Sequence, residues 1–486
     1  MRILALLPAL ALSACVVGPN YQRPATLTTA AAGFAETARA TTAATATPLP
    51  DHWWRLYNDP VLDRLVEDAL AHNTDIREAA ANLQRARAIL SEQRGARLPT
   101  ITPSAQYARQ QGNSANAAAF GGGSGAAQTF VFDSFQLGID ASYEVDLFGG
   151  VTRAVEASRG DADSAAALLD AARVSVAAET ARAYATACSN AAQLAVARET
   201  VGLQQQTYGL TKTLLDAGRG TRRDLERADV LLAQTQAQLP AFDAERRASL
   251  YALATLTGRP PAEIDADADR CTSAPTVGTV IPAGDGAALL ARRPDVRAAE
   301  RTLAADTARV GVAVADLYPS ITLLGRIGLN ATRGSQLFKG TSANYSFGPL
   351  ISWNFPNQTV ARARVRQAEA GADASLAKFD GAVLTALREV EQALARYAGA
   401  LDRNAALVRA EQASTAAAKL SKLRFDYGAD SFLLLIEAER DRADARAARA
   451  ASDAAVADAQ ISLFKALGGG WEDAAVPVRR EAASTP

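Results

Sequence analysis

The sequence predicts a mainly α-helical chain that contributes strands to a membrane β-barrel. Three observations support this fold class: a composition with only 6% aromatic residues, an internal repeat, and segments in which apolar and polar residues alternate. Few aromatic residues suit long, closely packed helices better than a large globular core. After residue 14 no stretch reaches about 18 consecutive apolar residues, the length of an ordinary transmembrane helix, so strands must do any spanning.

The N-terminus predicts export and a lipid anchor. One basic residue, Arg2, precedes an apolar run, as in a short secretory signal. A leucine and two small residues then stand directly before Cys15, as in the lipobox where bacterial signal peptidase cuts and the new N-terminal cysteine is acylated. The alternative is an ordinary signal followed by a chance cysteine. We expect Cys15 to carry the lipid, and Val16 in place of an Asp favours sorting to the outer membrane.

Composition excludes several function classes. Lys and Arg total 51 and Asp and Glu 52, so the chain has no basic footprint for nucleic acid. The two histidines, His52 and His72, accompany no nucleophile elbow, phosphate loop or dinucleotide fingerprint, so we expect no enzyme. The cysteines lack metal-site spacing and methionine is nearly absent, so neither a metal nor another cofactor is expected.

The same architecture occurs twice, with a repeat of about 210 residues. Residues 73–76 match residues 293–296, and Gly218 matches Gly428 further along. We therefore expect a signal peptide at 1–14, a lipid-anchored N-terminal segment with a first helix at 15–72, a first structural repeat at 73–258, an equatorial linker at 259–293, a second structural repeat at 294–468 and a C-terminal tail at 469–486.

Each half is expected to contain a β-hairpin. In residues 135–147 apolar residues alternate with mostly polar ones, the period of a strand with one apolar and one wet face. The second half predicts strands at 321–332 and 343–355. Segments rich in Gly, Ser and Asn, at 111–128 and 333–342, are expected to be exposed loops.

Each half also predicts a very long helix, at 152–216 and 359–427, which would measure roughly 100 Å. Each half also predicts a short helix, which ends at Pro99 in the first half and at Pro319 in the second, because proline cannot donate a helical hydrogen bond and keeps its predecessor extended. A short and a medium helix placed end to end make about 95 Å, so each half yields two rods of equal length. The short helices are expected at 73–98 and 294–317, and the medium helices at 221–258 and 431–468.

Two hairpins supply only four strands, which cannot close. An open sheet edge in lipid leaves backbone groups unpaired at a cost of several kcal/mol each, so the chain is expected to oligomerise. Three copies would supply 12 strands and two copies the minimum of 8. Three copies give a 12-strand barrel on a 12-helix periplasmic tunnel. The alternative is an ordinary soluble antiparallel sheet.

Cys188 and Cys271 remain once Cys15 is acylated, and they would lie in an oxidising compartment. Measured from the reversal at Gly218, Cys188 lies roughly 45 Å along one helix and Gly258 about 60 Å along the next, and 13 extended residues can cover the difference. This arithmetic predicts a disulfide that holds the linker against the long helix. The alternative is two buried free thiols.

The two helix reversals predict exposed tips. Glycine can end a helix in a left-handed conformation, and Thr or Ser can cap the next helix. The tip residues are Gly218, Gly220 and Thr221 in the first half and Gly428, Ala429 and Ser431 in the second.

With these elements placed, the sequence resembles the outer-membrane factor family, the TolC-like and NodT-like channels of tripartite efflux systems. The resemblance covers nearly the whole mature chain. It rests on Cys15-Val16-Val17-Gly18-Pro19-Asn20-Tyr21, the segment from Trp53-Trp54 to Leu62, the junctions at Pro99 and Pro319, Tyr143-Glu144-Val145-Asp146-Leu147-Phe148-Gly149, and the reversals at Gly218 and Gly428.

The resemblance implies a homotrimeric channel that lies in outer-membrane lipid and closes at its periplasmic tip. The tips would dock a periplasmic adaptor, or membrane fusion, protein and through it an inner-membrane pump. A lipid anchor favours a pump of the resistance/nodulation/division type. The alternatives are an outer-membrane component of type I protein secretion and a structural envelope lipoprotein, which would not need alternating strands.

The resemblance also implies a gate near the tips. Asp224 and Glu437 fall where related channels place acidic residues, and Leu434 stands where some relatives carry a further one. Three inward-facing carboxylates would form an electronegative ring, and arginines could compensate it and hold neighbouring helices shut. The expected gate residues are Arg222, Arg223, Asp224, Asp430 and Glu437.

Overall fold

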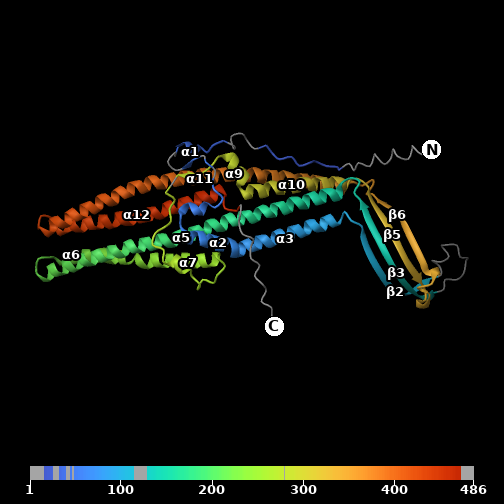
Figure 1. Cartoon of the computed structure of the whole chain (residues 1–486), viewed down its shortest axis with the longest axis horizontal. Coiled ribbons are helices and arrows are strands. Elements are labelled where there is room, and N and C mark those ends of the chain that lie inside the picture. The colour runs from blue at the N-terminus through green and yellow to red at the C-terminus, as the bar shows by residue number, and fades with distance from the viewer. Residues whose placement is uncertain are drawn as a thin grey trace. The chain divides into compact units, whose positions relative to one another are not determined.

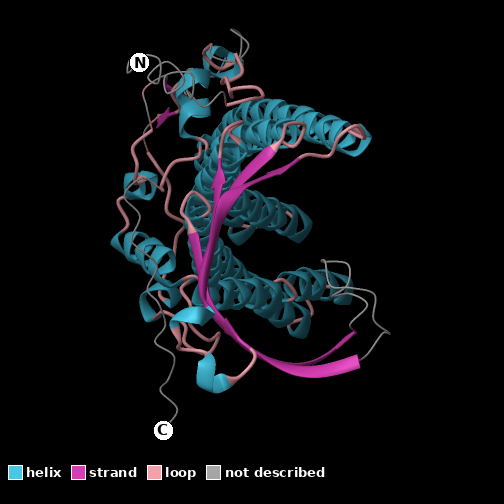
Figure 2. Cartoon of the chain, turned by 90° about the vertical axis from the view of Figure 1, so that its right-hand side faces the viewer, coloured by secondary structure: helices cyan, strands magenta, loops and turns pink. Residues whose placement is uncertain are grey.

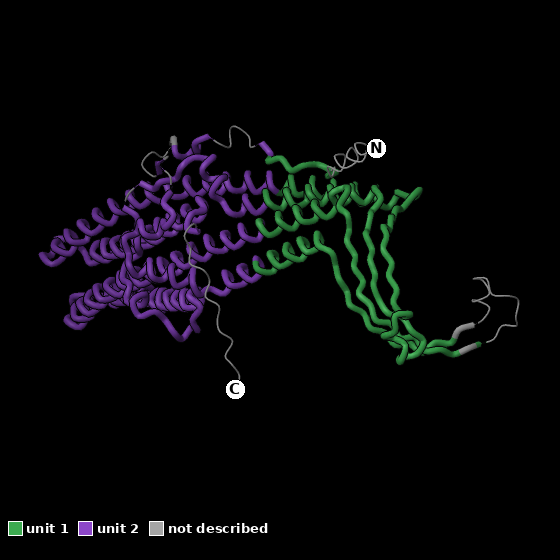
Figure 3. The backbone as a smooth tube through the Cα atoms, turned by 45° about the vertical axis from the view of Figure 1, so that its right-hand side comes forward, with its two compact units in different colours: residues 1–23, 84–163, 300–378 green, residues 24–83, 164–299, 379–486 purple. Residues whose placement is uncertain are grey.

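The computed structural model describes residues 16–25, 32–39, 44–45, 47, 49–113, 129–278 and 280–471. The chain divides into two compact units (Figure 3). Unit 1 comprises Met1–Arg23, Gln84–Asp163 and Glu300–Lys378, and unit 2 comprises Pro24–Leu83, Ser164–Ala299 and Phe379–Pro486.

Unit 1 contains a four-stranded antiparallel sheet in the order β2-β3-β5-β6 (Figure 2). The strands are β2 (Thr100–Asn113), β3 (Thr129–Val145), β5 (Ser320–Ala331) and β6 (Ala343–Ser352). The hairpins of the two halves therefore join through β3 and β5. β5 and β6 begin within one residue of the predicted starts, whereas β3 starts six residues earlier than residue 135 and β6 ends three residues before residue 355. The predicted loop at 333–342 contains the short 3-10 helices η3 (Gly334–Gln336) and η4 (Gly340–Ser342).

The long helices α5 (Gly150–Asp216) and α11 (Thr359–Asp426) lie where the sequence predicts them. The short helices are α3 (Thr74–Gly95) and α10 (Pro294–Ala315), and both end before the proline that follows them. In the second half the medium helix is continuous, α12 (Phe432–Leu467).

The medium helix of the first half differs from the prediction of one helix at 221–258. It is divided into α6 (Arg222–Gln236) and α7 (Leu239–Leu256). Pro240 stands in the first turn of α7, where its missing amide cannot continue the hydrogen bonding of α6.

Unit 2 has a core of helices and aromatic side chains. Trp53 stacks on Phe464 with ring centroids 4.7 Å apart, and both side chains are fully buried. Short elements also contribute side chains to this core or lie beside it. They are α1 (Ala35–Arg39), β1 (Ala44–Thr45) paired in parallel with β4 (Ile281–Pro282), η2 (Trp53–Tyr57), α2 (Pro60–His72), α8 (Ala266–Asp269) and α9 (Gly286–Arg292). Three of them, α1, α2 and α9, are labelled in Figure 1. Within the described ranges, every helix is too short or too polar to cross a lipid bilayer.

Candidate functional site

The sheet of unit 1 has one apolar face. Strand pairing places Leu137 opposite Leu329, and Ile139 opposite Ile327, which in turn lies opposite Tyr345. These apolar side chains are not covered: Ile327 is 65% exposed and Tyr345 85%. A continuous apolar surface of this kind marks a surface that contacts lipid or protein. The same face carries Ile101, Ala105, Tyr107, Phe135, Tyr143, Ile321, Leu323, Phe347 and Ile351.

The opposite face of the sheet is polar. Asp140 lies beside Arg326 at 3.7 Å and accepts a hydrogen bond of 3.3 Å from the Ser104 hydroxyl. Gly138 lies close to the neighbouring strand, because a Cβ there would be 3.3 Å from the carbonyl oxygen of Ile327. The alternation predicted for residues 135–147 is thus a property of the whole sheet. This face also carries Thr102, Gln136, Ser142, Glu144, Asn330, Asn344 and Ser346, together with Leu324 and Leu350.

Both edge strands are unpaired on their outer sides within the part of the chain that the structure describes. β2 pairs only with β3, and β6 only with β5. β2 has 14 residues and β6 has 10, so each edge presents a long row of free backbone donors and acceptors. Such edges are templates for another strand.

The segment after Cys15 is built into unit 1, whereas Cys15 itself lies outside the described residues. The amide of Val17 donates to the carbonyl of Phe148 at 3.2 Å. Arg153, whose side chain is 4% exposed, donates to the carbonyls of Val17 and Gly18 and to Asn20 Oδ1, at 3.1, 3.3 and 2.7 Å. Nothing in the sequence pointed to Arg153, because its partners lie more than a hundred residues away in the chain.

Gly218 and Gly428 end their helices as the tips require, with φ of +71° and +76°. Thr221 accepts the amide of Asp224 at 3.2 Å, and Ser431 accepts the amide of Leu434 at 3.5 Å. Gly220 is tightly placed, because a Cβ there would lie 3.0 Å from a backbone nitrogen of α5. Ala429 donates its amide to a carbonyl near the end of α11 at 2.8 Å.

The charged residues near the tips bond within their own hairpins. Asp224 accepts from the Thr221 hydroxyl at 2.5 Å, and Arg222 contacts Glu226 at 3.4 Å. Asp430, 14% exposed, is held by Arg424 at 2.9 Å. Glu437 and Arg223 are exposed, and within the described part of the chain no hydrogen bond or ion pair joins any two of the five predicted gate residues.

Sequence reasoning did not find two ion pairs in the second hairpin. One joins Asp430 to Arg424, which lies across the reversal, six residues earlier in the chain. The other is the pair Glu439 and Arg442, 2.5 Å apart and 12% and 15% exposed, in which burial raises the pKa of the glutamate. Glu439 had a signal in the sequence, since it follows Leu435 by one helical turn on the apolar side of α12, whereas Arg424, 61% exposed, had none.

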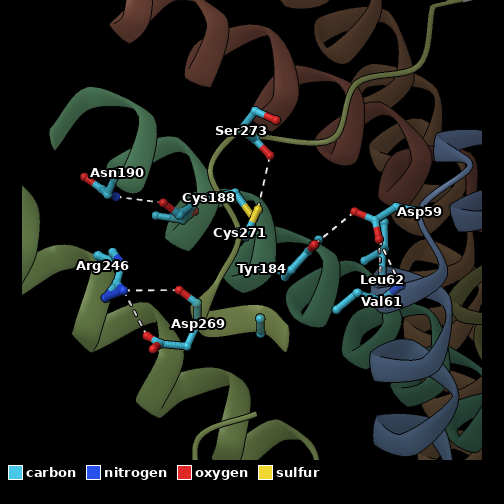
Figure 4. Close-up of a disulfide and its surroundings, with 12 residues drawn as sticks. Asp59, Val61, Leu62, Tyr184, Cys188, Asn190, Arg246, Asp269, Cys271 and Ser273 are labelled. Carbon is cyan, nitrogen blue, oxygen red and sulfur yellow. Dashed lines mark hydrogen bonds and ion pairs between the residues drawn. A yellow bond between two sulfur atoms is a disulfide. The ribbon is translucent and has the colours of Figure 1, made fainter. Parts of the chain in front are cut away.

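Cys188 and Cys271 form a disulfide with Cα atoms 5.1 Å apart (Figure 4). Cys188 lies on α5 and is fully buried, and Cys271 lies just after α8. One turn before Cys188, the Tyr184 hydroxyl donates to Asp59 at 3.0 Å, and burial raises the pKa of this tyrosine. The bond therefore fixes the linker to the long helix beside the core of unit 2.

Comparisons with known proteins agree with this geometry. The family model described as outer membrane efflux protein matches residues 65–259 and 287–469. Nodulation protein T of Rhizobium leguminosarum bv. trifolii is 30% identical over 96% of this chain and 97% of its own. Outer membrane protein OprJ of Pseudomonas aeruginosa is 31% identical over 96% of both chains.

Solved structures give the same result. The outer-membrane channel OprN is 37% identical, with a TM-score of 0.87 over 94% of this chain and 100% of that chain. The open state of the MtrE outer membrane channel of Neisseria gonorrhoeae is 29% identical, with a TM-score of 0.81 over 94% of this chain and 99% of that chain.

Proposed function

Because the chain belongs to the outer membrane efflux protein family, we propose that it is the passive exit duct of a tripartite efflux pump. The family consists of outer-membrane channels and not of enzymes. The protein lies in the outer membrane and extends into the periplasm. Its cargo is proposed to be small molecules such as drugs, since relatives at 29% identity include the outer membrane protein of a toluene efflux pump of Pseudomonas putida.

The single observation that supports a channel most strongly is the sheet, with one exposed apolar face, one polar face and two unpaired edges. Three copies would pair each β2 with a neighbouring β6 and close a 12-strand barrel. The apolar face would meet lipid and the polar face the lumen, so no backbone group would be left unpaired in the membrane. The helices of the homotrimer would form a 12-helix periplasmic tunnel, each chain contributing its duplicated unit.

Cys15 is proposed to carry the lipid that joins the chain to the inner leaflet of the outer membrane. Val16 to Asn20 are held by Arg153 and by close glycine contacts, so the acyl chains would emerge one residue from a fixed segment. The partner would be an inner-membrane pump of the resistance/nodulation/division type, reached through a periplasmic adaptor.

The adaptor is proposed to dock at the two kinds of tip, Gly218 to Thr221 and Gly428 to Ser431. Threefold symmetry would gather Arg222, Arg223, Asp224, Asp430 and Glu437 near one axis as the gate. Asp430 already has a cationic partner in Arg424, so Glu437 is the carboxylate with most freedom to face the lumen.

Reconstitution in planar bilayers tests the proposal. We expect discrete channel conductance and an assembly of three chains in mild detergent. A monomer without conductance would favour a structural envelope lipoprotein. Restored secretion of a protein substrate, without restored drug resistance in a channel-deficient strain, would favour type I secretion.

A further inference from the structure

A ladder of charged contacts joins α5 to α12 within unit 2. The two helices run antiparallel, and the paired residues are almost equally spaced on both: 20 residues separate Glu179 from Glu199 on α5, and 19 separate Lys465 from Arg446 on α12. The contacts therefore extend over about 30 Å of helix. The contacts are Lys465–Glu179 at 3.3 Å, Arg182–Asp458 at 2.9 Å and Arg446–Glu199 at 2.6 Å.

Arg446–Glu199 is the end of this ladder. Among the described residues, it is the last ion pair between the α5/α6 hairpin and the α11/α12 hairpin on the way to their tips. Beyond it the ends of the two hairpins lie apart (Figures 1 and 3). The tips are about 22 to 26 Å further along the helices. A rotation of about 10° at Arg446 would therefore move a tip by about 4 Å.

Arg446, on α12, contacts two other helices. Its guanidinium makes two hydrogen bonds to Glu199 on α5, at 2.9 and 2.6 Å, and lies 3.9 Å from Glu411 on α11. The side chain is only 20% exposed. The bonds from Arg446 lower the pKa of Glu199, so the glutamate stays ionised throughout the neutral range.

The packing around this arginine differs on the two sides of α12. Towards α5 and α7 the helix leaves a cavity of only about 40 Å³, lined by Val196, Phe242 and Ala447. Towards α11 and residues 273–280 it leaves a cavity of about 740 Å³, lined by Tyr397, Asn404 and Arg449 among others. Helix α12 is thus packed closely against α5 and α7 but borders open space towards α11, and beside that space Arg446 bonds to Glu199 on α5 and lies near Glu411 on α11.

Beside the cavity the helices are fixed more firmly. Gln460 on α12 is 1% exposed and makes paired hydrogen bonds of 3.1 Å with the amide and carbonyl of Val277. Six residues earlier, Cys271 is tied to α5 by the disulfide. The disulfide and the ion pairs Lys465–Glu179 and Arg182–Asp458 hold the C-terminal part of α12. Movement is therefore confined to the part of α12 between Arg446 and the tip.

We propose that Arg446 is the latch that sets how far the α11/α12 hairpin stands from the α5/α6 hairpin. In the assembled channel, three such latches set the width of the periplasmic end. This second statement rests on the proposed function, whereas the first concerns the single chain. The latch is distinct from the gate residues of the same hairpin, Glu437 and Asp430, which lie about 2.5 and 4.5 helical turns closer to the tip.

The experiment measures hairpin separation and conductance in the full-length protein. Spin labels on cysteines at Arg219 and Ala429 report the distance between tips, and unlabelled chains in excess leave one labelled chain in each assembly. In R446A and E199Q we expect the distance to shift by about 4 Å and single-channel conductance to rise about twofold. The charge-exchanged variant E199R/R446E should restore both values. R440A is the matched control, since Arg440 pairs only with exposed Asp444 on α12 itself, and should leave both unchanged.

Unchanged tip distances in R446A and E199Q would overturn the latch, as would an equal shift in R440A. Failure of E199R/R446E to restore the distance, with its thermal unfolding like that of wild type, would also overturn it. If wild type conducts no ions while the tip distance still shifts in R446A, the latch stands and the proposed channel fails. If wild type conducts and R446A changes neither quantity, the channel stands and the latch fails.

Discussion

Removing Arg153 should release the segment that follows the lipid anchor. Its guanidinium donates to two backbone carbonyls and one side-chain amide of residues 17, 18 and 20, at 2.7 to 3.3 Å, and is almost fully buried. Each bond from a charged donor contributes at least about 1 kcal/mol, so R153A should weaken the attachment by about 3 kcal/mol. Its contact with Glu156, 44% exposed, adds little.

Hydrogen exchange followed by mass spectrometry measures this local opening. The amide of Val17 is bonded to Phe148 and should be protected in the wild type. A loss of about 3 kcal/mol corresponds to exchange about 100-fold faster in the segment 16–25, without a comparable change in the sheet. R159A is the matched control, because Arg159 is exposed on the same helix.

A second variant reaches the same segment by another route. Gly18 has φ of +83°, and a Cβ there would lie 2.5 Å from the Cα of Gly311, so G18A should also accelerate exchange. Exchange in R153A equal to that in R159A would refute the reasoning. The same exchange rate in wild type and in G18A would show that the segment is not seated between these glycines.

Three further predictions test other parts of the molecule. Replacing both disulfide cysteines by serine opens a loop of sequence separation 83 and should destabilise unit 2 by about 4 kcal/mol, measured as a lower thermal midpoint; an unchanged midpoint contradicts it. F347D places a charge on the apolar face and should reduce outer-membrane assembly at about 2 kcal/mol per copy, whereas S346D on the polar face should not; equal membrane levels refute the assignment of faces. The hydrogen bond from Arg64 lowers the pKa of Asp265 to about 2, so the pair should contribute about 1 kcal/mol above pH 4, lost as the pH falls through 2. Thermal melts of D265N should lack this loss, and an identical acid profile in both proteins would exclude it.

Much of the fold could be predicted because its signals are local. Pro99 and Pro319 mark the ends of helices, and the alternation in residues 135–147 belongs to strand β3. The division of the medium helix at Pro240 had a signal as well, since proline breaks the hydrogen-bond ladder, but the repeat argued for one continuous helix as in α12.

The long-range contacts had no comparable signal. Arg446 and Glu199 are 247 residues apart in the chain, and on the sequence each is one of many charged residues on a long helix. Arg153 looks like a surface residue until the N-terminal segment is placed against it. The disulfide was predictable for a particular reason, because helix geometry converts residue counts into distances along parallel rods.

The duplicated halves have diverged at their tips. The first tip is charged, with Arg219, Arg222 and Arg223 around its reversal and Asp224 and Glu226 just after it. The second exposes apolar side chains, since Tyr427 is 83% exposed and Leu434 48%, together with Leu420, Leu423 and Leu433. In a threefold assembly these tips alternate around the periplasmic end. A partner that binds all six must therefore offer two kinds of site, one charged and one apolar, and a partner with six identical sites would match only half of them.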